Sequence, residues 1–145
     1  MGDLSKDINS KFENYRVKAL LNIIYTANWV TSIQSESLKN FGISQQQYNI
    51  LRILRGASEP LKVQTIKDRM LERSPNATRL MDKLCAKNLI KRLPSEHDRR
   101  VVKIEITEQG LNLLNTIPSD MNKFLIKNLS EDEAKQLSDL LDKMR

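Results

Sequence analysis

The sequence has one cysteine, one histidine and no long hydrophobic run. A lone cysteine excludes an intramolecular disulfide framework and is typical of the reducing cytoplasm, where we expect this protein to be located. Zinc sites need three or four ligands at defined spacing, so we expect neither a metal nor a cofactor. No apolar stretch reaches membrane-spanning length and none follows a basic start, so neither contact with the membrane nor a signal peptide is expected.

Glycine and proline are also scarce, with four of each among 145 residues. No glycine-rich phosphate loop and no catalytic Ser/His/Asp arrangement can be read, so no catalytic residues and no enzymatic activity are expected. Internal repeats and low-complexity segments are missing as well. With 39% apolar and 29% charged residues, the composition predicts one helix-rich soluble domain over residues 1–145.

The positive charge is concentrated in one segment. The chain carries a net charge of +6, and residues 62–103 contain 12 Lys or Arg and 5 Asp or Glu, a balance of +7. The remaining 12 basic and 13 acidic residues give −1. A basic excess usually marks only a solvated face, but its confinement to one segment favours an anionic partner for that segment.

That basic segment lies within residues 61–106, whose pattern predicts two helices, two strands and a basic loop. The first helix is expected over 63–71, followed by a turn at 72–74. Ser74 is then expected to cap a second helix that starts at Pro75. The second helix repeats apolar residues at helical spacing: Ala77, Leu80, Met81, Leu84 and Cys85. Its opposite face is polar and basic, so the pair of helices is typical of a helix-turn-helix.

Residues 89–93 and 101–106 are predicted to be strands. Val102, Ile104 and Ile106 alternate with polar residues, which is the period of a half-buried strand. The loop between the strands, residues 94–100, carries turn-forming residues and two arginines. A two-stranded ribbon with a basic tip is the wing of a winged helix-turn-helix.

Four motifs in this order resemble the MarR family of bacterial transcriptional regulators. They are Ala77–Leu84 (ATRLMDKL), Leu89–Arg92 (LIKR), Asp98–Arg100 (DRR) and Ile106–Gly110 (ITEQG). The family usually has a glycine where this chain has Asn88, but asparagine tolerates the left-handed conformation that a helix C-terminus needs. The resemblance implies a mainly helical fold with a small β-wing, and sequence-specific binding to double-stranded DNA.

The candidate DNA contacts lie on the second helix and the wing. The N-terminal turns of a helix in the major groove approach the base edges, where arginine can bind guanine and asparagine adenine. Lysines further along are better placed for phosphates. Asp98 is expected to brace an arginine, and the resemblance implies that a wing arginine, either Arg99 or Arg100, enters the minor groove. The candidates are Ser74, Asn76, Thr78, Arg79, Lys83, Lys87, Asp98, Arg99 and Arg100.

The two ends of the chain are predicted to be long helices, residues 1–37 and 107–145. One uninterrupted helix is expected over 4–37, whereas Pro118 should break the C-terminal segment. Between them and the helix-turn-helix, Ser44 and Gln47 predict a capping box for a helix that Gly56 stops. The terminal apolar stripes exceed what one small domain can cover. They favour a homodimer on a pseudo-palindromic operator, as the resemblance implies, over the alternative of a monomeric bundle.

The aromatic residues allow two interpretations. Tyr15, Tyr25 and Trp29 are interpreted as core residues, with a ligand cavity that also includes Tyr48 as the alternative. By resemblance, such a cavity would bind a small aromatic or anionic effector that releases DNA. We therefore expect a homodimeric transcriptional regulator, most simply a repressor. The competing hypothesis is a winged-helix protein-interaction module without DNA binding.

Overall fold

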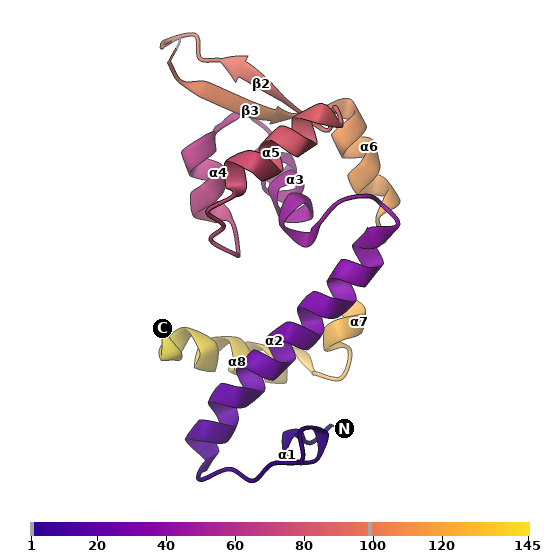
Figure 1. The fold of residues 1–145 in the computed structure, drawn as a ribbon, viewed down its shortest axis with the longest axis vertical. Helices are drawn as coiled ribbons and strands as arrows, with labels where there is room; N and C mark the ends of the chain where they lie inside the picture. Colours follow the sequence, from indigo (N-terminus) through magenta and orange to yellow (C-terminus); the bar gives the residue numbers. More distant parts are fainter. Residues whose placement is uncertain (1, 99) are drawn as a thin grey trace.

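A computed structural model describes residues 2–98 and 100–145 of the chain. Figure 1 shows one long helix, α2, that runs from a winged-helix unit at one end of the molecule to the N- and C-terminal segments at the other. The elements in chain order are α1 (Leu4–Asp7), α2 (Tyr15–Lys39), α3 (Gln45–Ala57), β1 (Leu61–Lys62), α4 (Val63–Arg69), α5 (Ala77–Ala86), β2 (Ile90–Pro94), β3 (Val102–Ile106), α6 (Glu108–Thr116), α7 (Lys123–Ile126) and α8 (Glu131–Met144). We call residues 43–117 the winged-helix unit, and α1, α2, α7 and α8 the terminal helices. The predicted fold class is confirmed.

The hydrophobic core lies in the winged-helix unit. α3 passes through its centre and buries Ile50, Leu51 and Leu54, while α5 buries Met81 and Leu84 against it. Of the 25 residues of α2, only Leu38 near its C-terminal end is buried, and α8 buries none. Helices derive most of their stability from packing an apolar face, so the winged-helix unit is the only part of the described chain with an extensive core of its own.

The sheet has three strands in the order β1-β3-β2, all antiparallel. Ile90 pairs with Ile106 at the base of the β2-β3 ribbon and Pro94 with Val102 at its far end. β1, which pairs Leu61 with Ile104, was not predicted, because two residues are too few to show an alternating pattern. The two predicted wing strands each begin one residue later than expected.

Polar side chains cap several helix ends. Ser44 with Gln47 forms the expected capping box at α3, and Ser130 with Glu133 forms a second capping box at α8. Thr107 accepts a hydrogen bond from Gly110 N at 3.0 Å and begins α6. The C-terminal segment breaks near Pro118, as predicted, because α6 ends at Thr116.

The expected single helix over residues 4–37 is wrong. The chain forms the four-residue α1, leaves helical geometry, and resumes as α2 at residue 15. Asn9 adopts a positive φ of 49°, and the Asn14 side chain accepts a hydrogen bond from Val17 N at 3.0 Å as the N-cap of α2. Asparagine side chains can replace helical hydrogen bonds with local ones of this kind. Asn9 and Asn14 therefore interrupt the helix that the apolar spacing predicted.

Three further boundaries differ from expectation. The connection between α4 and α5 covers residues 70–76, longer than the predicted turn at 72–74. α5 begins at Ala77 with Asn76 as its N-cap, whereas Ser74 accepts a hydrogen bond from Asn76 N at 3.2 Å within the preceding turn. Gly56 does not stop α3, which ends one residue later and is followed by Ser58 at a φ of 56°.

Candidate nucleic-acid interface

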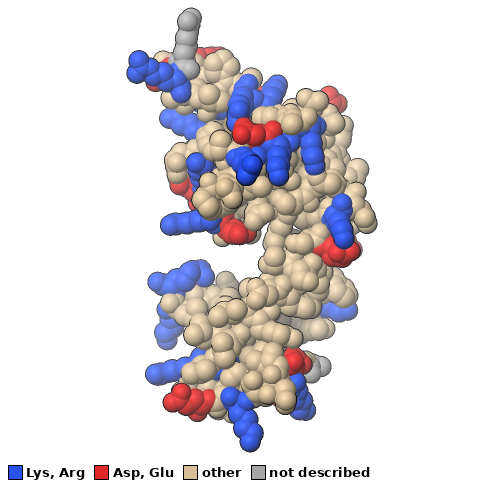
Figure 2. Space-filling view, in the orientation of Figure 1, with Lys and Arg blue, Asp and Glu red and all other residues tan. Residues whose placement is uncertain are grey.

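The outer face of α5 is the centre of the candidate interface, and we call α5 the reading helix. Ala77, Met81 and Leu84 are buried in the core, which turns the rest of the helix toward solvent. Most of the predicted contacts on this face are exposed: Asn76, Thr78, Arg79, Lys83 and Lys87. Ser74, before the helix, is half-buried. In Figure 2, Lys and Arg side chains gather over the reading helix and toward the wing.

The N-terminal end of the reading helix leaves its polar side chains available. The Asn76 side chain makes no capping hydrogen bond, and Ala77 N is bonded to Ser74 O at 3.3 Å. The first turn of a helix presents unpaired N–H groups and a positive dipole end, both of which favour an anion. Asn76, Thr78 and Arg79 therefore lie where a major-groove helix would approach base edges.

The C-terminal end of the reading helix is fixed by its backbone. Leu89 N donates to Leu84 O at 3.0 Å and Asn88 N to Cys85 O at 2.9 Å, with Asn88 at a φ of 57°. This is a Schellman motif with asparagine in the left-handed position, as the sequence predicted. Cys85 is half-buried and packs against the core. The helix is therefore held at the end opposite its candidate base-reading residues.

An ion pair joins the reading helix to the wing, which we define as β2, β3 and the loop between them. Arg92 of β2 donates to the carboxylate of Asp82 on the reading helix. Lys91 pairs with Glu105 across β2 and β3 at 2.9 Å. Sequence reasoning missed the first pair. Asp82 was the available signal, because a carboxylate among the lysines and arginines of this helix favours a cation beside it.

The tip of the wing is ordered by Asp98. Its carboxylate accepts a hydrogen bond from the backbone N–H of Arg100 at 2.9 Å, and its carbonyl accepts from Val101 N at 3.0 Å. Asp98 therefore holds Arg100, as expected, but through the backbone N–H of that arginine. Arg100 is exposed in this turn and precedes β3. Arg99 lies outside the described residues.

Lys87 differs from the other basic residues of the reading helix. Its ammonium group donates to the carbonyl oxygen of Gly42, in the turn that ends α2. No sequence signal pointed to this contact, because the two residues lie 45 positions apart. The contact does not favour the phosphate role predicted for Lys87.

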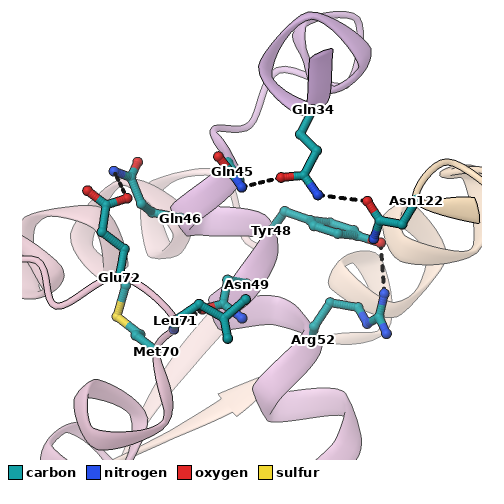
Figure 3. Close-up of a pocket in the computed structure, with 10 residues that line it drawn as sticks. All are labelled: Gln34, Gln45, Gln46, Tyr48, Asn49, Arg52, Met70, Leu71, Glu72 and Asn122. Atoms are coloured by element: carbon teal, nitrogen blue, oxygen red, sulfur yellow. Dashed lines mark hydrogen bonds between the residues drawn. The ribbon is translucent and has the colours of Figure 1, made fainter. Parts of the chain in front are cut away.

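A separate pocket of about 220 Å³ lies between α2, α3 and the connection that precedes the reading helix. Figure 3 shows Gln34 between Gln45 and Asn122, with hydrogen bonds on both sides, the one to Asn122 being 2.7 Å long. Arg52 Nη1 donates to the Tyr48 hydroxyl at 3.0 Å. On the other wall, Asn49 Oδ1 accepts from Leu71 N at 3.0 Å.

Of the four aromatic candidates for a ligand cavity, only Tyr48 lines this pocket. Tyr15, Tyr25 and Trp29 lie along α2 with 89%, 42% and 45% of their surface exposed. The interpretation of these three as core residues is therefore wrong, because none of them is buried in the single chain. Other apolar residues of α2, such as Leu20 and Ile24, are exposed as well.

Two kinds of feature are absent from the described residues. Residues 2–98 and 100–145 contain no group of three or more His, Cys, Asp or Glu side chains that could hold a metal ion. Within the same residues, no helix combines the length and apolar character required to cross a membrane.

Comparison with known proteins identifies the family. The profile of the MarR family matches residues 43–102. The HTH-type transcriptional regulator MhqR of Bacillus subtilis strain 168 is 32% identical over 114 residues, which cover 76% of this chain and 77% of that protein. A MarR transcription factor from Planctomyces limnophilus is 31% identical with a TM-score of 0.69, covering 91% of this chain and 98% of the other. The S. aureus MepR-DNA complex gives 27% identity and a TM-score of 0.76, over 92% and 97% of the two chains. The chain belongs to the MarR family.

Proposed function

We propose that this protein is a homodimeric, sequence-specific DNA-binding transcriptional regulator that represses its targets. The observation that carries the proposal is the reading helix itself: its apolar face is buried, its exposed face is polar and basic, and an ion pair couples it to a wing whose tip exposes Arg100. A helix of this character fits the major groove, while the wing reaches the neighbouring groove. The similar solved structures support this function, since one of them shows S. aureus MepR in complex with DNA.

Within this proposal, the interface divides into reading and anchoring residues. Asn76, Thr78 and Arg79 contact base edges, and Lys83 contacts a phosphate one turn further along. Arg100 enters the minor groove from the wing tip, where narrow A·T-rich grooves concentrate negative potential. A repressor acts by occupying such a site at a promoter.

Two copies are needed because one reading helix gives little affinity. The second copy covers the exposed apolar residues of the terminal helices, among them Leu20, Ile24 and Trp29 of α2 and Leu140 of α8. A two-fold dimer then presents two reading helices to a pseudo-palindromic operator, with half-sites about one helical turn apart.

Selection of genomic fragments by the purified protein, followed by sequencing, tests the function. We expect enrichment of one two-fold motif, and competition by that duplex but not by a scrambled one. Recovery of no sequence motif, together with capture of a protein partner through α5, would instead identify a protein-interaction module.

We further propose that the pocket beside Tyr48 binds a small aromatic or anionic effector that relieves repression. Tyr48 offers an aromatic face and Arg52 a cation at the same wall. The pocket is bounded by α2 on one side and by Met70, Leu71 and Glu72, which lead into the reading helix, on the other. A ligand that separated these walls would change the position of the reading helix relative to the terminal helices.

Calorimetric titration with benzoate, an aromatic carboxylate, tests the effector site. We expect binding that is lost in Arg52→Gln and kept in Arg55→Gln, an exposed arginine of the same helix that does not line the pocket. Equal binding to both variants would place the site elsewhere.

A further inference from the structure

The side chain of Lys87 connects the reading helix to the end of the long helix α2. Its Nζ donates to the carbonyl oxygen of Gly42. Gly42 has a φ of 69°, and a Cβ placed there would lie 3.7 Å from the same Nζ. The ammonium therefore sits against the turn that joins α2 to α3, on the side opposite the base-reading end of the helix.

Both ends of this contact are anchored. Lys87 is the C-cap of α5, with its N–H bonded to Lys83 O at 3.2 Å, next to the Schellman turn at Asn88. Gly42 N donates to Lys39 O at 3.2 Å, and the preceding Leu38 is fully buried in the core. A cation at the C-terminal end of a helix also meets the negative end of its dipole. The contact thus links two fixed points of the backbone.

A small rotation at this link has a large effect at a distance. α2 has 25 residues, and at 1.5 Å per residue it is about 37 Å long. In the proposed dimer, the terminal helices hold the two copies together, so the angle between α2 and α5 sets the separation of the two reading helices. DNA half-sites are fixed in spacing by the double helix, so that separation decides which operators fit.

We propose that Lys87 is a positioning residue that fixes the reading helix relative to α2, and thereby sets the half-site spacing that the dimer accepts. This inference rests on the proposed function of a DNA-binding dimer. Lys83 is the matched contrast: it lies one turn earlier on the same helix and is exposed, and its side chain makes no hydrogen bond or ion pair within the described chain. Lys83 is free to bind a phosphate, whereas Lys87 is engaged by the protein.

The test compares Lys87→Met, Lys87→Arg and Lys83→Met on the duplex that the wild-type protein selects from a random-sequence library. Affinity is measured against salt concentration, and on variants of that duplex with one base pair inserted or removed at its centre. Methionine keeps the apolar stem of lysine but removes its charge, and arginine keeps a donor that can reach the carbonyl.

For Lys87→Met we expect operator affinity to fall by up to about fivefold, the range of one exposed charged contact. The salt slope should stay unchanged and the preference for the native spacing should weaken, while Lys87→Arg restores both affinity and spacing. Lys83→Met should lower the slope by about 0.9 per protomer and keep the spacing preference. A slope reduction in Lys87→Met equal to that in Lys83→Met would make Lys87 a phosphate ligand and overturn the proposal. So would an unchanged spacing preference.

Hydrogen exchange of the free protein gives a readout that needs no DNA. Amides of residues 41–44 should exchange faster in Lys87→Met and at the wild-type rate in Lys83→Met. A wild-type protein that selects no duplex would contradict the proposed function, and with it the spacing role. If the wild-type protein binds DNA but residues 41–44 of Lys87→Met exchange at the wild-type rate, the positioning role of Lys87 is contradicted while the proposed function stands.

Discussion

At the scale of single residues, the exposed face of the reading helix separates two kinds of contact. Arg79 lies in the first turns of the helix, and Lys83 lies one turn beyond it; both side chains are exposed. A fork of donors on a base edge carries sequence information, whereas an ammonium on a phosphate carries only charge. Substitutions at the two positions should therefore have different signatures.

We expect Arg79→Ala to cost about 1–3 kcal/mol on the operator and to relax the preference at one base position per half-site. Lys83→Ala should weaken binding to operator and random DNA alike, with a slope reduction of about 0.9 per protomer. Fluorescence anisotropy with both duplexes across salt concentrations measures the two effects. Equal losses by Arg79→Ala on operator and random DNA would refute its base-reading role.

A second residue-scale prediction concerns Asp98 at the wing tip. Its carboxylate holds the backbone N–H of Arg100, so it orders the turn that presents this arginine. Asp98→Ala should weaken DNA binding although it removes a negative charge, because the turn must then be ordered on binding. Asp98→Asn keeps an acceptor for the N–H and should bind at least as well as the wild type.

Titration of both Asp98 variants and Arg100→Ala against operators with A·T-rich and G·C-rich flanks tests this account. Arg100→Ala should lose most on the A·T-rich duplex. Tighter binding by Asp98→Ala than by the wild type would show that its charge merely repels DNA.

At the scale of elements, two glycines in helices have opposite surroundings. A Cβ at Gly110 in α6 would lie 2.2 Å from Leu89 O and 2.8 Å from Ile106 Cγ1, whereas a Cβ at Gly56 in α3 would meet nothing within 4 Å. The missing side chain of Gly110 lets α6 approach the start of β2. Glycine at position 56 loses more conformational entropy on folding than alanine would, and no close contact requires it there.

We therefore expect Gly110→Ala to lower the free energy of unfolding by about 1–3 kcal/mol, because backbone must shift to admit the methyl group. Gly56→Ala should raise it by about 0.4–1 kcal/mol through the lower entropy of the unfolded chain. Urea unfolding of both variants measures the difference. A stabilising Gly110→Ala would mean that α6 does not pack against residue 89 as closely as described.

At the scale of the whole molecule, the sequence predicted the winged-helix unit well and the terminal segments less well. Repeated apolar spacing and caps such as Ser44 and Thr107 are local signals, so α3 and α6 could be read from them. The break before α2 depended on two asparagines that compete with the helical backbone. The Lys87–Gly42 contact and the pocket beside Tyr48 depend on tertiary packing, which no local pattern encodes.

The open faces of the terminal helices are a property of the whole molecule. α8 has 14 residues and buries none of them, and Leu140 and Met144 are 58% and 60% exposed. Isolated helices of this length are marginal in water, so α8 needs a partner surface to be stable. The proposed second copy supplies it.

The last prediction tests that second copy through α8. The double variant Leu137→Glu with Leu140→Glu should yield a monomer, because it places charges where apolar side chains would be buried between copies. The winged-helix unit should stay folded, since neither residue is part of its core. Sedimentation at micromolar concentration should show a dimer for the wild type and for Ser138→Glu, an exposed polar position on the same helix. Deletion of residues 130–145 should likewise abolish the dimer and operator binding. A wild-type protein that sediments as a monomer under these conditions would refute dimerisation through the terminal helices.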